Sequence, residues 1–295
     1  MSDQFYRAFE DRYRGSRDTV KARLTRYLGF VEPVARRHPG ASALDLGCGR
    51  GEWLEVLAGT RLQPFGVDLD DEMLDVARAL GLPVARADVL EYLESVPADS
   101  QAVVTAFHLV EHLPFTAVRH IVAESLRVLK PGGLLIMETP NPENIAVATC
   151  GFYLDPTHHH PIPPRLLYFV AEYHGFHRVK VVRLQESIEL LQREVPTLCE
   201  VLQGASPDYA IVAQKKADTA VLADTEEQFA ADYGLTLETL AARYDQGMQA
   251  KVREAEDHVA LARREIDALV SSTSWKVTKP LRWLTGTIRA LVKKG

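Results

Sequence analysis

The feature that most constrains this chain is a glycine-rich turn between a short apolar segment and a predicted helix, at residues 44–53. Glycines occupy positions 47, 49 and 51. Glycine has no Cβ, so the backbone N–H groups of such a turn can approach a ligand closely. A second apolar segment ends at Asp68, 21 residues after Gly47. An acid there can accept hydrogen bonds from both hydroxyls of a ribose, so turn and acid together predict a site for a ligand that contains adenosine.

The spacing of the glycines excludes two other nucleotide sites. Position 52 is Glu, where the dinucleotide fingerprint G-x-G-x-x-G needs glycine. A P-loop is excluded because no Gly-Lys-Ser or Gly-Lys-Thr follows the turn. Asp45, which precedes the turn, suits a cationic group such as the ammonium of an amino acid. The D-x-G-x-G-x-G pattern of residues 45–51 resembles the first motif of class I S-adenosylmethionine (SAM) methyltransferases, and the resemblance implies SAM as the cofactor.

Apolar segments alternate with helical patterns from residue 42 onward, which predicts an α/β fold. The expected class is a Rossmann-like, seven-stranded class I methyltransferase sheet, mostly parallel and doubly wound with a reversed final strand. A long C-terminal helix follows it. Strands are expected at 42–47, 63–69, 83–88, 102–108, 132–139, 178–185 and 209–215, and helices at 51–58, 71–80, 90–95, 114–129 and 164–174.

Composition shifts along the chain predict five segments. They are an N-terminal helical lid at 1–40, the methyltransferase domain at 41–216, a small and acidic linker at 217–235, a coiled-coil helix at 236–271 and a basic tail at 272–295.

The helix at 236–271 carries two interleaved series of apolar residues with a seven-residue period. Val252, Val259 and Ile266 form one series, and the other contains Met248, Ala255, Ala262 and Leu269. Such an a/d seam is typical of a coiled coil. It predicts self-association or a glycosyltransferase partner through residues 236–271, and docking of the helix on its own domain is the alternative.

The tail predicts a short amphipathic helix. Leu281, Leu284, Ile288 and Leu291 are spaced by three, four and three residues, and basic residues fall toward the other face. With its tryptophans, such a helix suits an anionic membrane surface. A partner-docking helix or a disordered basic tail are the alternatives.

Composition excludes several classes of protein. The net charge of −6 argues against nucleic-acid binding. Three cysteines far apart indicate neither a disulfide framework nor a zinc site. The N-terminus has no apolar run of signal-peptide length. We therefore expect a cytoplasmic protein, peripheral at the inner face of the cytoplasmic membrane.

The resemblance to methyltransferases assigns further cofactor contacts. It implies that Asp88 meets the adenine amino group and that the following backbone N–H, of Val89, meets a ring nitrogen; without the motifs, Asp88 is an ordinary helix cap. The N-terminal segment is aromatic and basic, and by position the resemblance implies that Tyr6 and Arg23 help to hold SAM. The full candidate cofactor set is Asp45, Gly47, Cys48, Gly49, Gly51, Asp68, Leu69, Asp88, Val89, Phe107, Tyr6 and Arg23.

The end of the fourth strand carries candidate catalytic residues. Glu111-His112-Leu113-Pro114 resembles the E-H-[LV]-P segment of small-molecule and quinone-type O-methyltransferases. A histidine near its neutral form is a natural general base for a hydroxyl acceptor. Some relatives bind a divalent metal with a carboxylate at position 108, so His108, Glu111 and His112 are an alternative metal set. The other alternative is that Glu111 and His112 only cap the next helix.

A loop rich in histidine and proline, residues 152–161, follows the fifth strand, where acceptor-recognition insertions sit in class I enzymes. Asp155 with His158 or His160 could form a base, an Asp–His dyad or a metal site. A surface loop with incidental histidines is the alternative.

Residues 1–216 resemble one group of class I methyltransferases in particular. Phe-Tyr-Arg-Ala-Phe-Glu-Asp at 5–11 and Tyr-Leu-Asp-Pro-Thr-His at 153–158 are similar to bacterial methyltransferases of polysaccharide and O-antigen loci, related to WbdD-type chain terminators but without their kinase domain. The resemblance implies O-methylation of a sugar hydroxyl on a lipid-linked surface glycan. The alternatives are a quinone- or small-metabolite-type O-methyltransferase with a divalent metal, and a non-catalytic SAM-binding scaffold of a glycan assembly complex.

Overall fold

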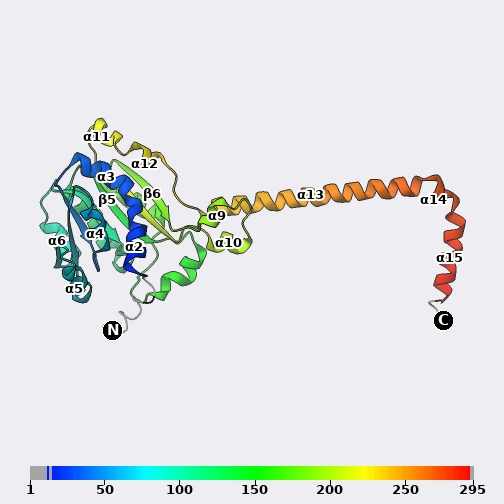
Figure 1. The fold of residues 1–295 in the computed structure, drawn as a ribbon, viewed down its shortest axis with the longest axis horizontal. Coiled ribbons are helices and arrows are strands. Elements are labelled where there is room, and N and C mark those ends of the chain that lie inside the picture. Colours follow the sequence, from blue (N-terminus) through cyan, green and yellow to red (C-terminus); the bar gives the residue numbers. More distant parts are fainter. Residues whose placement is uncertain (1–11, 13–14, 293–295) are drawn as a thin grey trace. The chain divides into compact units, whose positions relative to one another are not determined.

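The computed structural model describes residue 12 and residues 15–292 of the chain (Figure 1). The chain divides into two compact units, Met1–Leu240 and Ala241–Gly295. The first unit contains the sheet and the helices that cover it, and the second contains most of one long helix and the tail.

A seven-stranded sheet organises the first unit. The strands follow the order β3-β2-β1-β4-β5-β7-β6, and all are parallel except β7, which pairs antiparallel with both β5 and β6. The predicted Rossmann-like methyltransferase sheet with a reversed final strand is confirmed. The bounds are β1 Ser42–Leu46, β2 Gln63–Asp68, β3 Val84–Arg86, β4 Gln101–Phe107, β5 Leu129–Pro140, β6 Arg178–Leu184 and β7 Asp208–Gln214.

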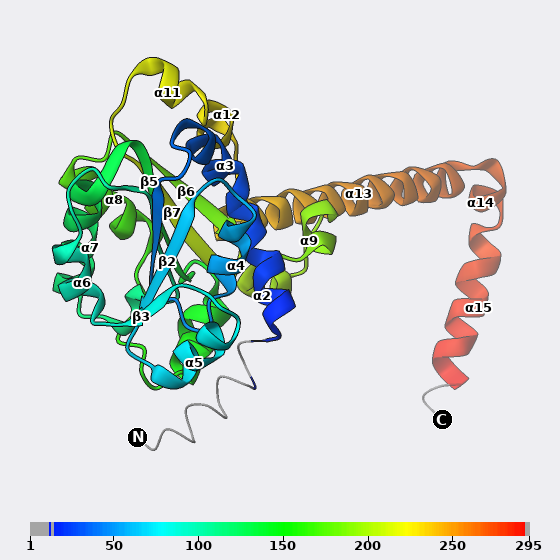
Figure 2. The same ribbon diagram turned by 60° about the vertical axis from the view of Figure 1, so that its left-hand side comes forward.

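Helices cover both faces of the sheet (Figure 2). One face packs against α6, α7 and α8, and the other against α2, α3 and α4. The bounds are α2 Arg17–Leu24, α3 Leu28–Arg37, α4 Glu52–Ala58, α5 Asp71–Ala79, α6 Val89–Ser95, α7 Phe115–Val128 and α8 Pro164–His174. Two short helices, α9 Ile188–Gln192 and α10 Leu198–Gln203, lie between β6 and β7 in the chain.

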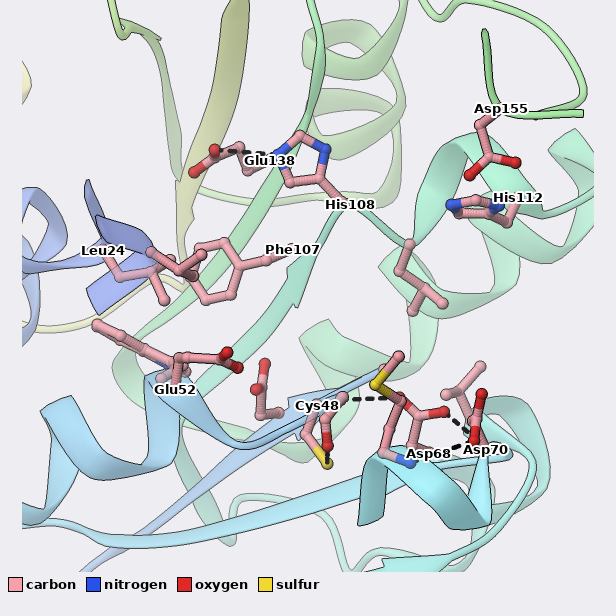
Figure 3. Close-up of a pocket in the computed structure, with 18 of the residues that line it drawn as sticks. Leu24, Cys48, Glu52, Asp68, Asp70, Phe107, His108, His112, Glu138 and Asp155 are labelled. Atoms are coloured by element: carbon pink, nitrogen blue, oxygen red, sulfur yellow. Dashed lines mark hydrogen bonds and ion pairs between the residues drawn. The ribbon is translucent and has the colours of Figure 1, made fainter. Parts of the chain in front are cut away.

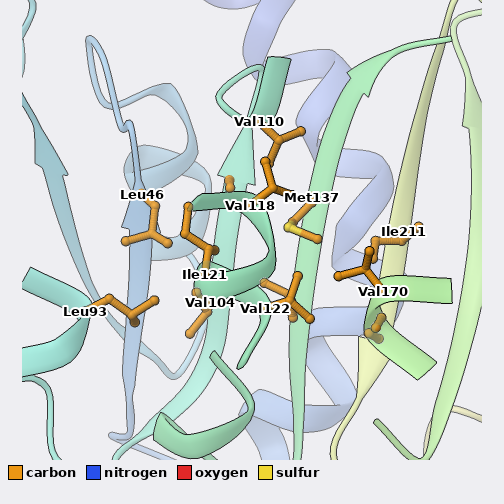
Figure 4. Close-up of a cluster of buried hydrophobic side chains, with 14 of the residues drawn as sticks. Leu46, Leu93, Val104, Val110, Val118, Ile121, Val122, Met137, Val170 and Ile211 are labelled. Atoms are coloured by element: carbon orange, nitrogen blue, oxygen red, sulfur yellow. The ribbon is translucent and has the colours of Figure 1, made fainter. Parts of the chain in front are cut away.

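The core has two halves because successive residues of a strand point to opposite faces. In β5, Leu135 and Met137 join the cluster under α7, whereas Leu134 and Ile136 join the cluster under α3. Figure 4 shows the first cluster, in which side chains of α7 meet those of β4 and β5. A fully buried side chain of this size contributes about 1.5–3 kcal/mol. This packing fixes the strand ends that carry the polar residues described below.

The segment 217–235, expected to be a linker, differs from that expectation. It forms α11 (Thr219–Ala223) and α12 (Glu226–Ala230), and both belong to the first unit. Arg37 donates to Asp224 with an Nη2–Oδ2 distance of 2.7 Å, and the ring of Phe229 lies 5.6 Å from that of Phe30. The segment consists largely of small and acidic residues, and that composition does not indicate that it contacts the methyltransferase domain.

The second unit is helical. α13 runs over Leu237–Ser271, close to the predicted range, and α14 (Thr273–Val277) and α15 (Lys279–Val292) follow. The seam residues Val252, Val259 and Ile266 are each more than half exposed. Among the described residues, no helix combines the length and apolar composition that a membrane span requires.

Candidate active site

A cavity of about 560 Å³ opens at the carboxyl ends of the parallel strands. The glycine-rich turn lies on its wall: Gly47 and Gly49 line the cavity, whereas Gly51 does not. Gly51 is the N-cap residue of α4, with a φ of +79°, and a Cβ there would lie 2.6 Å from a methyl group of Leu82. The third glycine of the motif therefore serves the packing of the turn, whereas the first two contribute to the wall of the cavity.

Three acids predicted to hold the cofactor line the cavity, and each has a defined partner. Asp45 accepts a hydrogen bond from Thr105 Oγ1 at 2.7 Å. Asp68 accepts from the Gly49 N–H at 2.8 Å, so it also fixes the turn. Asp88 accepts from two N–H groups at the start of α6, so it is a helix cap and a cavity residue at once.

The other predicted cofactor residues divide as follows. Leu69, Val89 and Phe107 line the cavity, as do Cys48 and Arg23. Tyr6 lies outside the described residues. Figure 3 shows Asp68 and Asp70 at one end of the cavity, and His108, Glu138, His112 and Asp155 at the other.

His108 joins two buried carboxylates. Its Nδ1 lies 3.1 Å from Glu111 Oε1 and its Nε2 3.3 Å from Glu138 Oε1. Burial lowers the pKa of His108, but hydrogen bonds to the two carboxylates outweigh it, and the pKa rises well above 6.5. The raised pKa favours an imidazolium, which can donate from both nitrogens. Nearly half of its side chain is open, and this surface faces the cavity.

Glu111 itself is 1% exposed and does not line the cavity. Burial raises the pKa of Glu111, but the hydrogen bond and charge of His108 outweigh it and lower the pKa. Glu111 is hydrogen-bonded to His108, with 3.1 Å between Oε1 and Nδ1, and no hydrogen bond joins Glu111 to the other candidate, His112, among the described residues.

His112 lies at the end of a hydrogen-bonded chain that begins at Asp155. The Thr157 hydroxyl donates to Asp155 Oδ1 at 2.6 Å, and its oxygen lies 2.8 Å from His112 Nδ1. Burial raises the pKa of Asp155, but hydrogen bonds from Thr157 outweigh it and lower the pKa, so the carboxylate only accepts. Since Thr157 has one hydrogen, its oxygen must accept from His112 Nδ1–H. The lone pair of His112 therefore lies on Nε2.

Two influences keep His112 neutral. Burial lowers its pKa below 6.5, and neighbouring His158 lowers it further against the opposing charges of Glu111 and Asp155. The rings of His112 and His158 are 4.6 Å apart, and His158 Nδ1 lies 2.7 Å from the Phe152 carbonyl oxygen. His160 is exposed, so the structure brings His158, and not His160, into this group.

The predicted alternative metal set His108, Glu111 and His112 is not among the groups of described residues whose donor atoms all lie within 4.8 Å of one another. Within the described chain, two other groups bring three donor atoms within 4.8 Å of one another. They are Glu111, His112 and His158, and His108, Glu138 and Asp208.

Sequence reasoning missed Glu138, Gln185 and Asp208, which line the cavity, as well as Thr157. Glu138 accepts from Tyr27 and, at 3.3 Å, from Gln185 Nε2. A lone acid inside the apolar strand 134–139 was a visible signal for Glu138. Gln185 and His108 have φ angles of 67° and 50°, a strained backbone for residues other than glycine, and both contact Glu138.

Comparison with known proteins identifies the family. A family model described as a methyltransferase domain matches residues 13–181, more than half of the chain. A solved SAM-dependent methyltransferase from Archaeoglobus fulgidus is 31% identical, with a TM-score of 0.63, and the match covers 72% of this chain and 100% of that one. This chain belongs to the class I SAM-dependent methyltransferases. It is thus an enzyme that uses SAM.

Curated relatives of this methyltransferase are named ubiquinone biosynthesis O-methyltransferase. The protein from Hahella chejuensis is 35% identical over 131 residues, which is 42% of this chain and 54% of the relative. The protein from Bordetella pertussis is 32% identical over 131 residues, which is again 42% of this chain and 54% of the relative. The chain thus spans about half the length of the curated relatives it matches.

The residues present fit SAM. SAM carries an ammonium and a sulfonium, and the cavity wall offers carboxylates at Asp45, Asp68 and Asp88. A Cβ on Gly66 in β2 would lie 2.6 Å from the Cβ of Cys48, so the glycine lets β2 pack closely against the turn. The turn, the second strand and the third strand therefore form one continuous cofactor wall.

Proposed function

We propose that this protein transfers the methyl group of SAM to a hydroxyl oxygen of a small hydroxylated metabolite, with His112 as the general base. The observation that carries the proposal is the chain Asp155–Thr157–His112, which leaves an unprotonated Nε2 on a histidine that lines the cavity. The names of the curated relatives support a small acceptor and O-methylation.

Methyl transfer to a hydroxyl requires a methyl donor and a base that takes the hydroxyl proton. SAM supplies an electrophilic methyl group. The acceptor hydroxyl becomes nucleophilic as it loses its proton, and His112 Nε2 receives that proton while Thr157 and Asp155 hold the imidazolium that forms. A lowered pKa suits this role, because His112 is then neutral at pH 7. No metal is required by this scheme.

A second candidate acceptor is the terminal sugar hydroxyl of a lipid-linked bacterial polysaccharide, as in O-antigen-type glycans. Its support is the second unit, in which the exposed apolar seam of α13 and the basic tail offer surfaces for self-association or a glycosyltransferase, and for an anionic membrane. A small acceptor in solution gives no reason for such surfaces. The resemblance to polysaccharide-locus methyltransferases supports the same candidate, but the curated names do not.

Radiolabelled methyl transfer from SAM tests both. The acceptors are catechol-type small molecules and lipid-linked glycan extract, each with and without EDTA. We expect label in the small acceptors, insensitive to EDTA, and a loss of about 100-fold or more in His112→Ala. His120→Ala, which removes an exposed histidine of α7, is the control.

Other outcomes separate the alternatives. Label in the glycan alone favours the second candidate. Label that EDTA abolishes favours a metal-dependent enzyme and contradicts the histidine base. No label in any acceptor, with SAM binding intact, favours a non-catalytic scaffold.

A further inference from the structure

The ends of β4, β5 and β7 form a wall of the cavity that contains none of the predicted cofactor acids. His108 follows β4, Glu138 lies in β5, and Asp208 is the first residue of β7. All three line the cavity, and each offers an atom within 4.8 Å of the others. The predicted cofactor acids instead belong to β1, β2 and the end of β3. This second wall is therefore available to the acceptor.

Two members of this wall are fixed by the protein. Glu138 accepts from Tyr27, Gln185 and His108, and His108 also donates to Glu111. Their hydrogen-bonding capacity is largely used. They form a rigid support and leave few free positions for a ligand.

Asp208 differs from its neighbours. Its carboxyl group has no hydrogen bond or ion pair to any described residue. Burial raises its pKa to about 6, the charges of Glu138 and Glu111 also raise it, and His108 and Arg23 act in the opposite direction. Asp208 is partly exposed and lines the cavity, so its carboxyl group is free to hydrogen-bond to a ligand there.

The charge of the cavity limits what that ligand can be. Among the described residues, eight carboxylate side chains line the cavity and only one arginine does. A phosphate or carboxylate next to Asp208 would meet like charge in an enclosed place. A neutral hydroxyl avoids this penalty, and it can both donate to a carboxyl group and accept from it.

We propose that Asp208 is a specificity residue for the acceptor, and that it binds a second hydroxyl of a neutral diol while the first hydroxyl faces His112. The inference rests on the proposed O-methyltransferase function. Two separate groups of residues support it: His112 belongs with Thr157 and Asp155, whereas Asp208 belongs with His108 and Glu138. Removing the second hydroxyl should then weaken binding without affecting the base.

The test measures binding to the full chain saturated with S-adenosylhomocysteine, so that no methyl transfer is needed. The probes are catechol, phenol, a methyl hexopyranoside and its 6-phosphate, titrated by calorimetry into the wild type, Asp208→Asn and Asp70→Asn. Asp70 is an acid at the other end of the cavity that caps α5, and asparagine preserves that cap.

We expect catechol or the methyl hexopyranoside, the two probes with adjacent hydroxyls and no charge, to bind the wild type more tightly than phenol or the hexopyranoside 6-phosphate does. Asp208→Asn should weaken that diol about 10-fold, because a charge-assisted hydrogen bond becomes a neutral one, and should leave phenol unchanged. Asp70→Asn should not alter diol affinity. Asp208→Asn should also keep or raise the melting temperature, since it removes an unpaired acid, whereas a structural role would lower it.

Binding of neither diol, equal affinity of wild type and Asp208→Asn for the diol, or preference for the phosphate would overturn the proposal. The two proposals fail differently. A wild type that binds diols yet transfers no methyl contradicts the proposed function alone. Methylation that is indifferent to Asp208→Asn contradicts the specificity role alone.

Discussion

Replacing His108 by alanine tests whether its charge holds Glu111 and Glu138 in place. The imidazole nitrogens lie 3.1 and 3.3 Å from the two carboxylates, which are only 1% and 5% exposed. Breaking a fully buried ion pair costs about 3–5 kcal/mol, and an exposed pair contributes about 0–1 kcal/mol. Because 46% of the His108 side chain is open to the cavity, water screens part of the interaction. We therefore expect a loss of about 2 kcal/mol.

For a unit of this size, that loss corresponds to a fall of roughly 4–8 °C in melting temperature. Circular dichroism of the full chain measures it. The effect must also depend on pH in one direction. The pKa of His108 is raised in the folded state, so the stabilisation is complete below pH 6.5 and is lost as pH rises through the folded pKa. The difference between wild type and variant should be larger at pH 6 than at high pH.

Two controls sharpen the test. His120→Ala removes a histidine of the same side-chain exposure, 46%, whose partner Glu94 is exposed, and it should cost no more than about 0.5 kcal/mol. Adding Glu111→Gln to His108→Ala should restore part of the loss, because one buried charge no longer needs a partner. A melting temperature that does not change in His108→Ala, or a difference that is the same at all pH values, would refute the reasoning.

Two further predictions concern the base and the long helix. Asp155→Asn removes a charge that raises the pKa of His112, so the acid limb of the pH profile of kcat/KM should move to lower pH. We also expect kcat to fall about 10-fold. If neither the acid limb nor kcat changes, the hydrogen-bonded chain Asp155–Thr157–His112 does not orient the base. Val259→Asp puts a charge in the apolar seam of α13, so light scattering should show a monomer where the wild type is an oligomer. Glu254→Lys, which lies outside the seam, should leave the oligomer unchanged. A monomeric wild type would contradict self-association through α13.

The cofactor half of the site could be predicted from the sequence because its residues lie in contiguous motifs. The turn around Gly47, the acid Asp68 and the acid Asp88 each follow a predicted strand at a regular spacing. Each of these places is defined by local structure alone. The strand pattern likewise depends on short-range periodicity, so all seven predicted strands overlap the observed ones.

The proposed acceptor half could not be predicted in the same way, because it depends on pairing between distant segments. Asp208 lies opposite Pro140 of β5 and Leu184 of β6 only once β7 runs antiparallel to both. Thr157 is an ordinary loop residue until its hydroxyl lies between Asp155 and His112. His108 was predicted as a catalytic or metal-binding residue, and only the fold brings it between the two carboxylates that raise its pKa.

The antiparallel strand β7 has a consequence for how such an enzyme can change over time. Because β7 enters the sheet in reverse, a segment near the end of the catalytic unit starts at the same edge where the first strands finish. Asp208 and the glycine-rich turn are therefore encoded far apart and share no loop. If Asp208 binds the acceptor as proposed, mutation there can change the choice of acceptor while the turn at residues 47–51 remains intact.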